Sequence, residues 1–459
     1  MRDSIQPARL ARPRRAHLLA VALPLVTGVL VTGCTGSSGT SPTPTHSARA
    51  VAASGCVAPP SSSCLAPRLL RAAYGIQPLL DGGTDGRGET VTVLAAPVAP
   101  APSTTTTAPP QNAPVEGLSG EFPNVSYLGQ DLDAFDSMFG LPAARIQVVT
   151  TLTGSASPGP ASIEEVQDLE VVHAVAPAAT LRLVLMPASA LASGAHAAAD
   201  MLAGVRLAVS GTSVAAIGWG MGEHFFTKAQ AAQMHSILRR AAAHHVTVVA
   251  ASGDNGVYSE PYGGGQVKEV SLPASDPLVL AVGGTTLTAN TVTGTYTSET
   301  VWNGNAGVDA TGGASGGGFS HLYARPSYQD GIPAISARRG VPDVAGDASG
   351  LGGAAIVFAS GGKTFVDGAA GTGAAAMLWG GLMALADQYA HHGLGLVNPA
   401  IYRIGRSSAY HKAFHDVTTG NNLLTGSVTG DRYHAGPGWD PVTGWGSPSA
   451  QALIPRLAR

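Results

Sequence analysis

The chain has 459 residues, a formal net charge of −3 and only 12% charged residues, whereas soluble domains typically carry about 25%. No basic stripe is present, which argues against a nucleic-acid partner. With 44% hydrophobic residues, 60 glycines and 32 prolines, the composition predicts a loop-rich α/β globule rather than a disordered chain.

Residues 1–33 are predicted to be an export signal of the lipoprotein type. Arginines crowd the first fifteen positions and precede the apolar run Leu18–Leu30, which is short for a membrane span and fits a signal-peptide core. The run ends in Val31-Thr-Gly-Cys34, the pattern of a bacterial lipobox. We therefore expect Cys34 to carry lipid and to hold the protein on the outer face of the membrane. An ordinary secretory signal is the alternative, and Sec and twin-arginine export both stay open.

Residues 34–62 are rich in Ser, Thr, Pro and Ala and are predicted to be a flexible tether. One domain is expected to follow at 63–459. Export favours an oxidising compartment, so Cys56 and Cys64 are expected to pair in a disulfide.

Helical and strand patterns alternate along the first half of this domain. A low-complexity loop is expected at 95–120, and glycine-rich loops are expected to dominate from Gly253 to the last long helix. The alternation predicts a parallel sheet with helices on both faces, in a domain expected to be monomeric. Strands are predicted at 86–94, 146–150, 181–186, 214–217 and 246–251, and helices at 64–75, 132–139, 163–175, 193–209, 228–245 and 374–391.

Two stretches carry carboxylates in positions suited to acid–base chemistry. Glu164 and Asp168 are four residues apart on a predicted helix, which places them on one face. Paired acids raise one another's pKa, as a carboxylate base requires. Asp254 follows a predicted buried strand in Ser252-Gly-Asp-Asn-Gly256, where a protonated carboxyl could donate a hydrogen bond to an oxyanion.

A third stretch combines a tight turn with the start of a helix. Asp367-Gly-Ala-Ala-Gly-Thr-Gly373 leads directly into the alanine-rich segment that follows. Such a turn presents its last residue at a helix N-terminus, beside main-chain N–H groups that can stabilise a developing oxyanion. Here that last residue is Gly373, which has no side chain to attack a carbonyl.

A fourth stretch near the C-terminus has the composition of a calcium site. Asp416 is followed at a distance by Gly436-Pro-Gly438-Trp-Asp440. Two carboxylates and the main chain at spaced glycines make a hard-oxygen cage of the kind that Ca²⁺ prefers.

These stretches together resemble the sedolisin family of serine-carboxyl peptidases, to which kumamolisin and tripeptidyl-peptidase I belong. Further family motifs occur in family order over roughly residues 64–449: Trp219-Gly-x-x-Glu223, Pro273-Ala-Ser-Asp-Pro277, Val282-Gly-Gly-Thr-Thr286, Gly316-Gly-Gly-Phe-Ser320, Arg325-Pro-Ser-Tyr-Gln329 and Gly340-Val-Pro-Asp-Val344. The resemblance implies a subtilisin-like α/β fold, with a central parallel sheet flanked by helices, glycine-rich loops and a C-terminal calcium-site loop.

The resemblance also implies roles for individual residues. Glu164 would be the general base, Asp168 would orient it, and Asp254 would face the oxyanion. Gly373 would occupy the position of the missing serine. One Ca²⁺ would be held by two aspartates and three main-chain carbonyls, at Asp416, Val417, Gly436, Gly438 and Asp440.

Gly373 is therefore the departure that decides the functional interpretation, and Gly218 departs as well, from a serine before Trp-Gly. The preferred hypothesis is an exported, inactive peptidase homologue that still binds peptides or unfolded protein. The alternatives are an active acid endopeptidase that uses Thr372 or a water activated by Glu164, and a surface module without catalysis.

Overall fold

The computed structural model describes residues 64–95, 126–150, 163–186, 195–259, 267–304, 312–360, 362–424, 427 and 429–459. Contacts divide the chain into two units, 1–44 and 45–459, and every described residue lies in the second. The signal segment and the tether lie outside the described residues, so the predicted domain boundaries remain predictions. Cys64 is disulfide-bonded, while Cys34 and Cys56 lie outside the described part. None of the described helices combines the length and apolar character needed to cross a bilayer.

The described helices and strands alternate along the N-terminal half, and strands are denser in the second half. The helices are α2 (Pro67–Ala73), α3 (Gln77–Asp81), α4 (Ser126–Phe139), α5 (Ile163–Val175), α6 (Ala195–Ala208), α7 (Lys228–Ala243), α8 (Gly371–Ala390), α9 (Asn398–Gly405), α10 (Tyr410–Ala413) and α11 (Ala450–Leu457), with 3₁₀ turns η2 (Glu223–Phe225) and η3 (Ser327–Gln329). The strands are β1 (Thr90–Leu94), β2 (Arg145–Thr150), β3 (Thr180–Leu185), β4 (Val214–Ile217), β5 (Met221–Gly222), β6 (Thr247–Ala251), β7 (Ser271–Leu272), β8 (Leu280–Ala289), β9 (Tyr296–Val301), β10 (Gly318–Ala324), β11 (Arg338–Val341), β12 (Val344–Asp347), β13 (Ala355–Ser360), β14 (Lys363–Gly368), β15 (Phe414–His415) and β16 (Ser447–Pro448).

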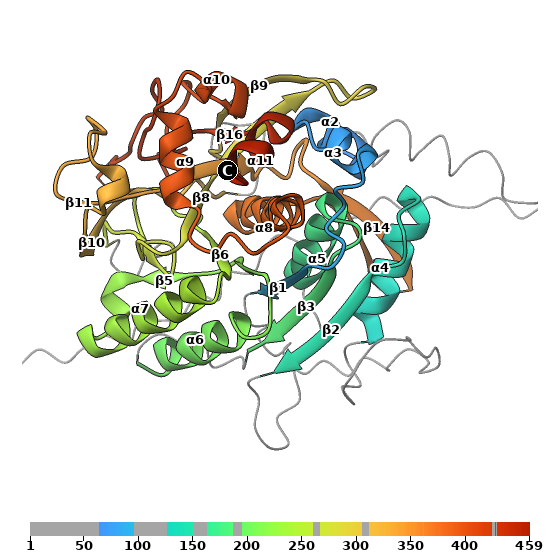
Figure 1. The fold of residues 1–459 in the computed structure, drawn as a ribbon, viewed down its shortest axis with the longest axis horizontal. Coiled ribbons are helices and arrows are strands. Elements are labelled where there is room, and N and C mark those ends of the chain that lie inside the picture. Colours follow the sequence, from blue (N-terminus) through green and yellow to red (C-terminus); the bar gives the residue numbers. More distant parts are fainter. Residues whose placement is uncertain are drawn as a thin grey trace, which may run out of the picture. The chain divides into compact units, whose positions relative to one another are not determined.

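A central sheet organises the domain, with strand order β12-β8-β6-β4-β1-β3-β2. All of these neighbours pair in parallel, and β9 adds an antiparallel pair on β8. Helices α5 and α8 pack on one face, and α6 and α7 pack on the other (Figure 1). Because both faces are covered, β4 and β6 are buried along their whole length and consist of apolar residues and one threonine.

The hydrophobic pattern sorts side chains to the two faces strictly by alternation. In β4, Val214 and Ala216 join the core cluster under α5 and α8, whereas Ala215 and Ile217 join the cluster under α6 and α7. This is the period of two that a pleated strand requires. Helix α8 has alanine and glycine at many of its contacts, so it lies close against the sheet, and its first 17 residues, Gly371–Asp387, are all buried.

The predicted elements of the first half are confirmed with small shifts in their boundaries. Helix α5 and strand β4 have the predicted bounds. Helix α7 begins at Lys228 because Thr227 and Gln230 form a reciprocal capping box. Helix α4 begins six residues before the predicted start, at Ser126. In the second half, α8 begins three residues before its predicted start, at Gly371.

The prediction that loops dominate after Gly253 was wrong. Strands β8 and β12 belong to the central sheet, and β10, β11, β13 and β14 form two hairpins beside it. These strands were not predicted because their sequences are rich in glycine, which usually indicates a loop. In the structure, a Cβ at residues 283, 284 or 346 would collide with neighbouring side chains or main chain. Close approach of packed elements, rather than a turn, explains these glycines.

A fully buried ion pair joins β11 to the start of β12. The Arg339 guanidinium donates to both carboxylate oxygens of Asp343, at 2.7 and 2.6 Å. Asp343 also accepts from the Ala281 main chain, the Asn398 amide and the Tyr402 hydroxyl. Burial alone would lower the pKa of Arg339, but the Asp343 carboxylate, together with Tyr328 and Tyr402, outweighs burial and raises that pKa.

We predict that Arg339→Met lowers the free energy of unfolding by about 3–5 kcal/mol, because it leaves Asp343 buried without its counter-charge. Arg338→Met is the matched control, since Arg338 is exposed and donates only to the His321 carbonyl oxygen. Urea denaturation of both variants measures the difference. Equal stability of the two variants would contradict the assignment of Arg339 as a structural counter-ion.

Candidate active site

The candidate site residues gather where the parallel strands end. Asp254 follows β6, Gly218 follows β4, and the N-terminus of α8 lies beside both. The carboxyl edge of a parallel sheet is the usual location of a binding site in open α/β folds. The fold therefore brings together residues that are more than 200 positions apart in the sequence, because Asp168 and Gly373 both contact Gly218.

Asp254 is hydrogen-bonded to the first turn of α8. Its Oδ1 accepts from the Thr372 main-chain N–H at 2.9 Å and from the Thr372 hydroxyl at 2.7 Å. The Thr372 hydroxyl in turn accepts from the Gly253 N–H at 3.1 Å. Burial raises the pKa of Asp254, and the two Thr372 bonds lower it less. Asp254 is thus a carboxyl that takes up a proton readily and is held in place by the turn.

Gly371 is required by this arrangement. Its φ is +87°, and a Cβ there would lie 2.7 Å from Asp254 Oδ2. A side chain at 371 would therefore strain the main chain and push the carboxyl away. Gly373 differs, because its φ lies outside the left-handed region and a Cβ there would meet only the Gly218 carbonyl oxygen, at 3.1 Å.

The acid pair lies on the first turns of α5. Asp168 is fully buried, and neither of its carboxyl oxygens meets a hydrogen-bond partner among the described residues. Burial, followed by the neighbouring charge of Glu164, raises the pKa of Asp168 well above its usual range, while the adjacent Gln167 lowers it less. Glu164 is half-buried. The two carboxyls therefore interact electrostatically, as their spacing predicted, and burial favours the neutral form of Asp168.

Gly218 connects the acid pair to the helix start. A Cβ at Gly218 would lie 2.6 Å from Asp168 Oδ2 and 3.4 Å from Met377 Cε. The Gly218 carbonyl oxygen faces Gly373 from the other side. Two residues without side chains thus stand opposite each other, and the Asp168 carboxyl occupies the space on the Gly218 side.

Gln167 links helix α5, which carries Glu164 and Asp168, to the residue before α8. The sequence analysis did not identify Gln167 as a site residue. Its amide accepts from the Ala370 N–H at 2.8 Å and donates to the Ala370 carbonyl at 3.0 Å. The pair of bonds fixes α5 to the residue immediately before Gly371. The only sequence signal was its position between Glu164 and Asp168, because the partner is main chain and leaves no residue-type signature.

The predicted calcium residues converge on one glycine loop. The Gly438 N–H lies 3.2 Å from both carboxylate oxygens of Asp416, and the Gly436 N–H donates to Asp440 Oδ2 at 3.1 Å. Asp440 also accepts from the Val442 and Thr443 main chain. Burial raises the pKa of Asp440 to about 6. Both carboxylates therefore lie at the loop, where the glycines contact them through main-chain N–H groups. Carboxylate oxygens are ligands that suit Ca²⁺.

Comparison with known proteins finds relatives over about half to two thirds of the chain. The chain is 37% identical to kumamolisin from Bacillus sp. (strain MN-32) over 307 residues, which is 64% of the chain and 51% of the relative. It is 39% identical to sedolisin from Pseudomonas sp. (strain 101) over 216 residues, 46% of the chain and 35% of the relative. Human tripeptidyl-peptidase 1 is 28% identical over 352 residues, which is 71% of this chain and 57% of the relative. No family model matches the chain.

A solved structure agrees with these relatives. Pseudomonas sedolisin, a serine-carboxyl proteinase complexed with two molecules of pseudo-iodotyrostatin, matches with a TM-score of 0.66 and 28% identity, over 86% of this chain and 98% of that structure. The chain is a homologue of the sedolisin-family peptidases. The predicted subtilisin-like fold with a central parallel sheet is confirmed. The homologue spans about half the length, or less, of the curated relatives named above.

We predict that alanine substitutions at Gly371 and Gly373 change the stability by different amounts. Gly371→Ala should lower the free energy of unfolding by about 1–3 kcal/mol, the usual cost of a strained main-chain conformation. Gly373→Ala should change it by less than about 1 kcal/mol, because alanine is a better helix former and the nearby Gly218 oxygen needs to move only slightly. Urea titration measures both; a cost at 373 equal to that at 371 would contradict the geometry described here.

Proposed function

We propose that this sedolisin-family homologue is an inactive peptidase that still binds peptides. The observation that carries the proposal is Gly373, which stands at the N-terminus of α8, where the resemblance expects the nucleophilic serine. Glycine supplies no oxygen, so no acyl–enzyme can form there. In comparable peptidases, removal of the serine lowers kcat about 10⁶-fold. The remaining site still accelerates hydrolysis about 10³–10⁴-fold over the uncatalysed reaction in water.

The rest of the proposed machinery is suited to peptide binding at this site. Asp254 takes a proton readily, and a neutral carboxyl can donate a hydrogen bond to a substrate carbonyl. The first turn of α8 offers main-chain N–H groups that lack partners within the helix. Glu164 and Asp168 provide a carboxyl pair on the opposite side of Gly373, across Gly218. These groups would hold a peptide carbonyl without attacking it.

The geometry disfavours Thr372 as a substitute nucleophile. Its hydroxyl donates to Asp254 and accepts from the Gly253 N–H. An attacking oxygen must pass its proton to a base while it faces the substrate carbonyl. The Thr372 hydroxyl is occupied in holding the Asp254 loop, so its removal should loosen the site rather than end a reaction.

We predict that the wild-type protein does not cleave peptides at a measurable rate and that Gly373→Ser gains peptidase activity at acidic pH. The helical main chain at 373 accepts a Cβ, and the new hydroxyl would start beside the Gly218 oxygen. Activity should fall as pH rises, because the raised pKa of Asp254 keeps its carboxyl protonated only in acid. Hydrolysis of a quenched fluorescent peptide library at pH 3–8 measures this.

Gly373→Ala is the matched control, since it adds the Cβ without the hydroxyl. Gly373→Ser combined with Glu164→Gln should lose the gained activity. Wild-type cleavage that survives Thr372→Val and disappears in Glu164→Gln would refute the proposal and indicate a water activated by the acid pair. Absence of peptide binding to both wild type and Gly373→Ser would favour the surface-module hypothesis.

We propose that Asp416, Val417, Gly436, Gly438 and Asp440 hold one Ca²⁺ and that this ion supports the C-terminal loops. We predict that added Ca²⁺ raises the melting temperature of the wild type and that Asp416→Asn removes the response. A ligand at a hundredfold excess over its Kd adds about 2.7 kcal/mol to the free energy of unfolding. Mg²⁺ at the same concentration is the control, and a melting temperature unchanged by Ca²⁺ would contradict the site.

We further propose that the protein is exported and held on the outer face of the membrane through lipid on Cys34, as the lipobox pattern suggests. We predict that Cys34→Ala moves the protein from the membrane fraction to the soluble fraction or leaves the signal segment uncleaved. Fractionation and mass spectrometry of the N-terminus measure both effects. Equal membrane retention of the two proteins would contradict lipidation.

A further inference from the structure

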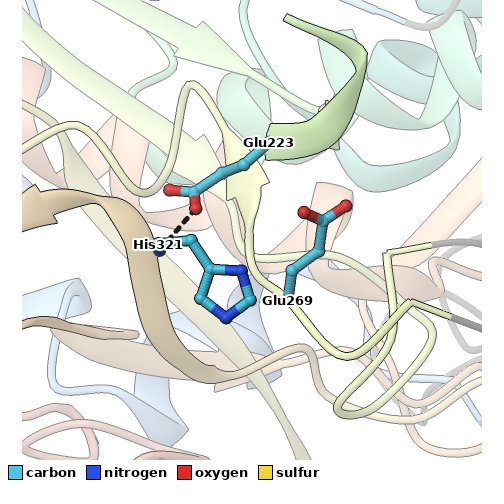
Figure 2. A group of neighbouring side chains, drawn as sticks. All are labelled: Glu223, Glu269 and His321. Atoms are coloured by element: carbon cyan, nitrogen blue, oxygen red, sulfur yellow. Dashed lines mark hydrogen bonds between the residues drawn. The ribbon is translucent and has the colours of Figure 1, made fainter.

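Two carboxylates and an imidazole outside the candidate active site converge from three elements. Glu223 begins the 3₁₀ turn η2, Glu269 precedes β7, and His321 lies in β10. One oxygen of each glutamate and one ring nitrogen of His321 all lie within 4.8 Å of one another. Figure 2 shows the His321 side chain between the two glutamates. We propose that this cluster binds a divalent transition-metal ion, with Zn²⁺ as the ion that its donors fit best.

The first argument is charge. Glu223 is 2% exposed, and the side chain of Glu269 is 2% exposed. Two carboxylates buried this close to each other are costly unless a cation neutralises them. The two basic side chains nearby are directed elsewhere: Lys268 pairs with Asp431, and Arg338 donates to the main-chain oxygen of His321. A protonated His224 on Glu269 would cancel only one of the two charges.

The second argument is the way in which the carboxylates are held. Glu223 accepts from the His321 N–H at 2.6 Å, from the Leu322 N–H, and from the Ser320 hydroxyl. Glu269 accepts from the His224 main chain at 3.1 Å and contacts its ring nitrogen. Ligating carboxylates in metal sites are oriented in this way by surrounding donors. Protein donors therefore orient both carboxylates without the help of an ion.

The third argument is space. A Cβ at Gly222 would lie 2.3 Å from Glu269 Oε1, so glycine at this position makes room for the carboxylate. A cavity of about 170 Å³ adjoins the cluster and is lined by Glu269 and His321 among others. It offers room for a water or a further ligand on the ion. The side chain of His321 is exposed, so its ring has freedom to adjust toward a bound ion.

The donor set decides the kind of ion. Imidazole nitrogen together with carboxylate oxygen suits Zn²⁺ and its neighbours in the first transition series, whereas Ca²⁺ and Mg²⁺ take oxygen ligands. The cluster is therefore distinct from the proposed calcium loop in chemistry as well as in residues. The inference does not depend on whether the protein cleaves peptides. An ion here would join η2, the segment before β7 and β10.

The test is calorimetric titration of the full chain with Zn²⁺ in saturating Ca²⁺, which keeps the calcium loop out of the measurement. We expect one site, and at least tenfold weaker binding in His321→Ala, because even an outer-shell partner of a metal contributes about 10–100-fold. The His321→Ala main chain still donates to Glu223, so the fold is kept. His321→Asp should restore binding. His392→Ala, at an exposed histidine in another part of the chain, should bind as the wild type does.

Co²⁺ gives a second readout that does not involve activity. A four-coordinate Co²⁺ site absorbs in the visible range, and this band should appear in the wild type and be lost in His321→Ala and Glu269→Gln. Three results would overturn the proposal: no Zn²⁺ binding at millimolar concentration, an affinity unchanged in both His321→Ala and Glu269→Gln, or an equal loss in His392→Ala.

Discussion

The hydrogen bonds between Asp254 and the first turn of α8 are the interaction on which the site depends. Asp254 comes from the end of β6, and the turn belongs to the helix that fills one face of the sheet. Oδ1 accepts both the main-chain N–H and the hydroxyl of Thr372, so the loop and the helix start cannot move separately. Gly371 makes this contact possible, because any side chain there would displace the carboxyl.

Burial of acids is the second constraint on the site. The pKa of Asp168 is raised by burial and then by Glu164, and burial raises the pKa of Asp254. A carboxyl with a raised pKa in the folded state binds its proton more tightly there than in the unfolded chain. Such groups contribute stability that is present at low pH and is lost as pH rises through the folded pKa. These two carboxyls therefore favour the folded state more in acid than at neutral pH.

Two glycines, Gly218 and Gly373, lie against each other between the acid pair and the start of α8. Gly373 lacks the attacking oxygen, and Gly218 lacks the Cβ that would collide with Asp168 Oδ2. The two positions are coupled by contact, since the Gly218 carbonyl faces Gly373. A side chain introduced at 373 would therefore lie against the Gly218 main chain, so substitutions at the two positions should affect each other.

Periodicity and spacing in the sequence were enough to define the N-terminal α/β half. They placed α5 and β4 at their observed bounds, because a proline just after a helix and a short apolar run in a strand are local signals. The Glu164 and Asp168 spacing likewise implied one helix face. The resemblance in motifs indicated the fold, and the solved sedolisin structure confirmed it.

Only the tertiary structure revealed the contacts made through the main chain and the places where a glycine leaves space for a neighbouring side chain. Gln167 binds the main chain of Ala370, and Gly218 makes room for Asp168; neither partner can be read from residue type. The strands after Gly253 were hidden for the same reason, because their glycines serve close packing rather than turns. Glu223, Glu269 and His321 meet because β5 pairs with β7 and η2 contacts β10, and such long-range pairing leaves no local pattern.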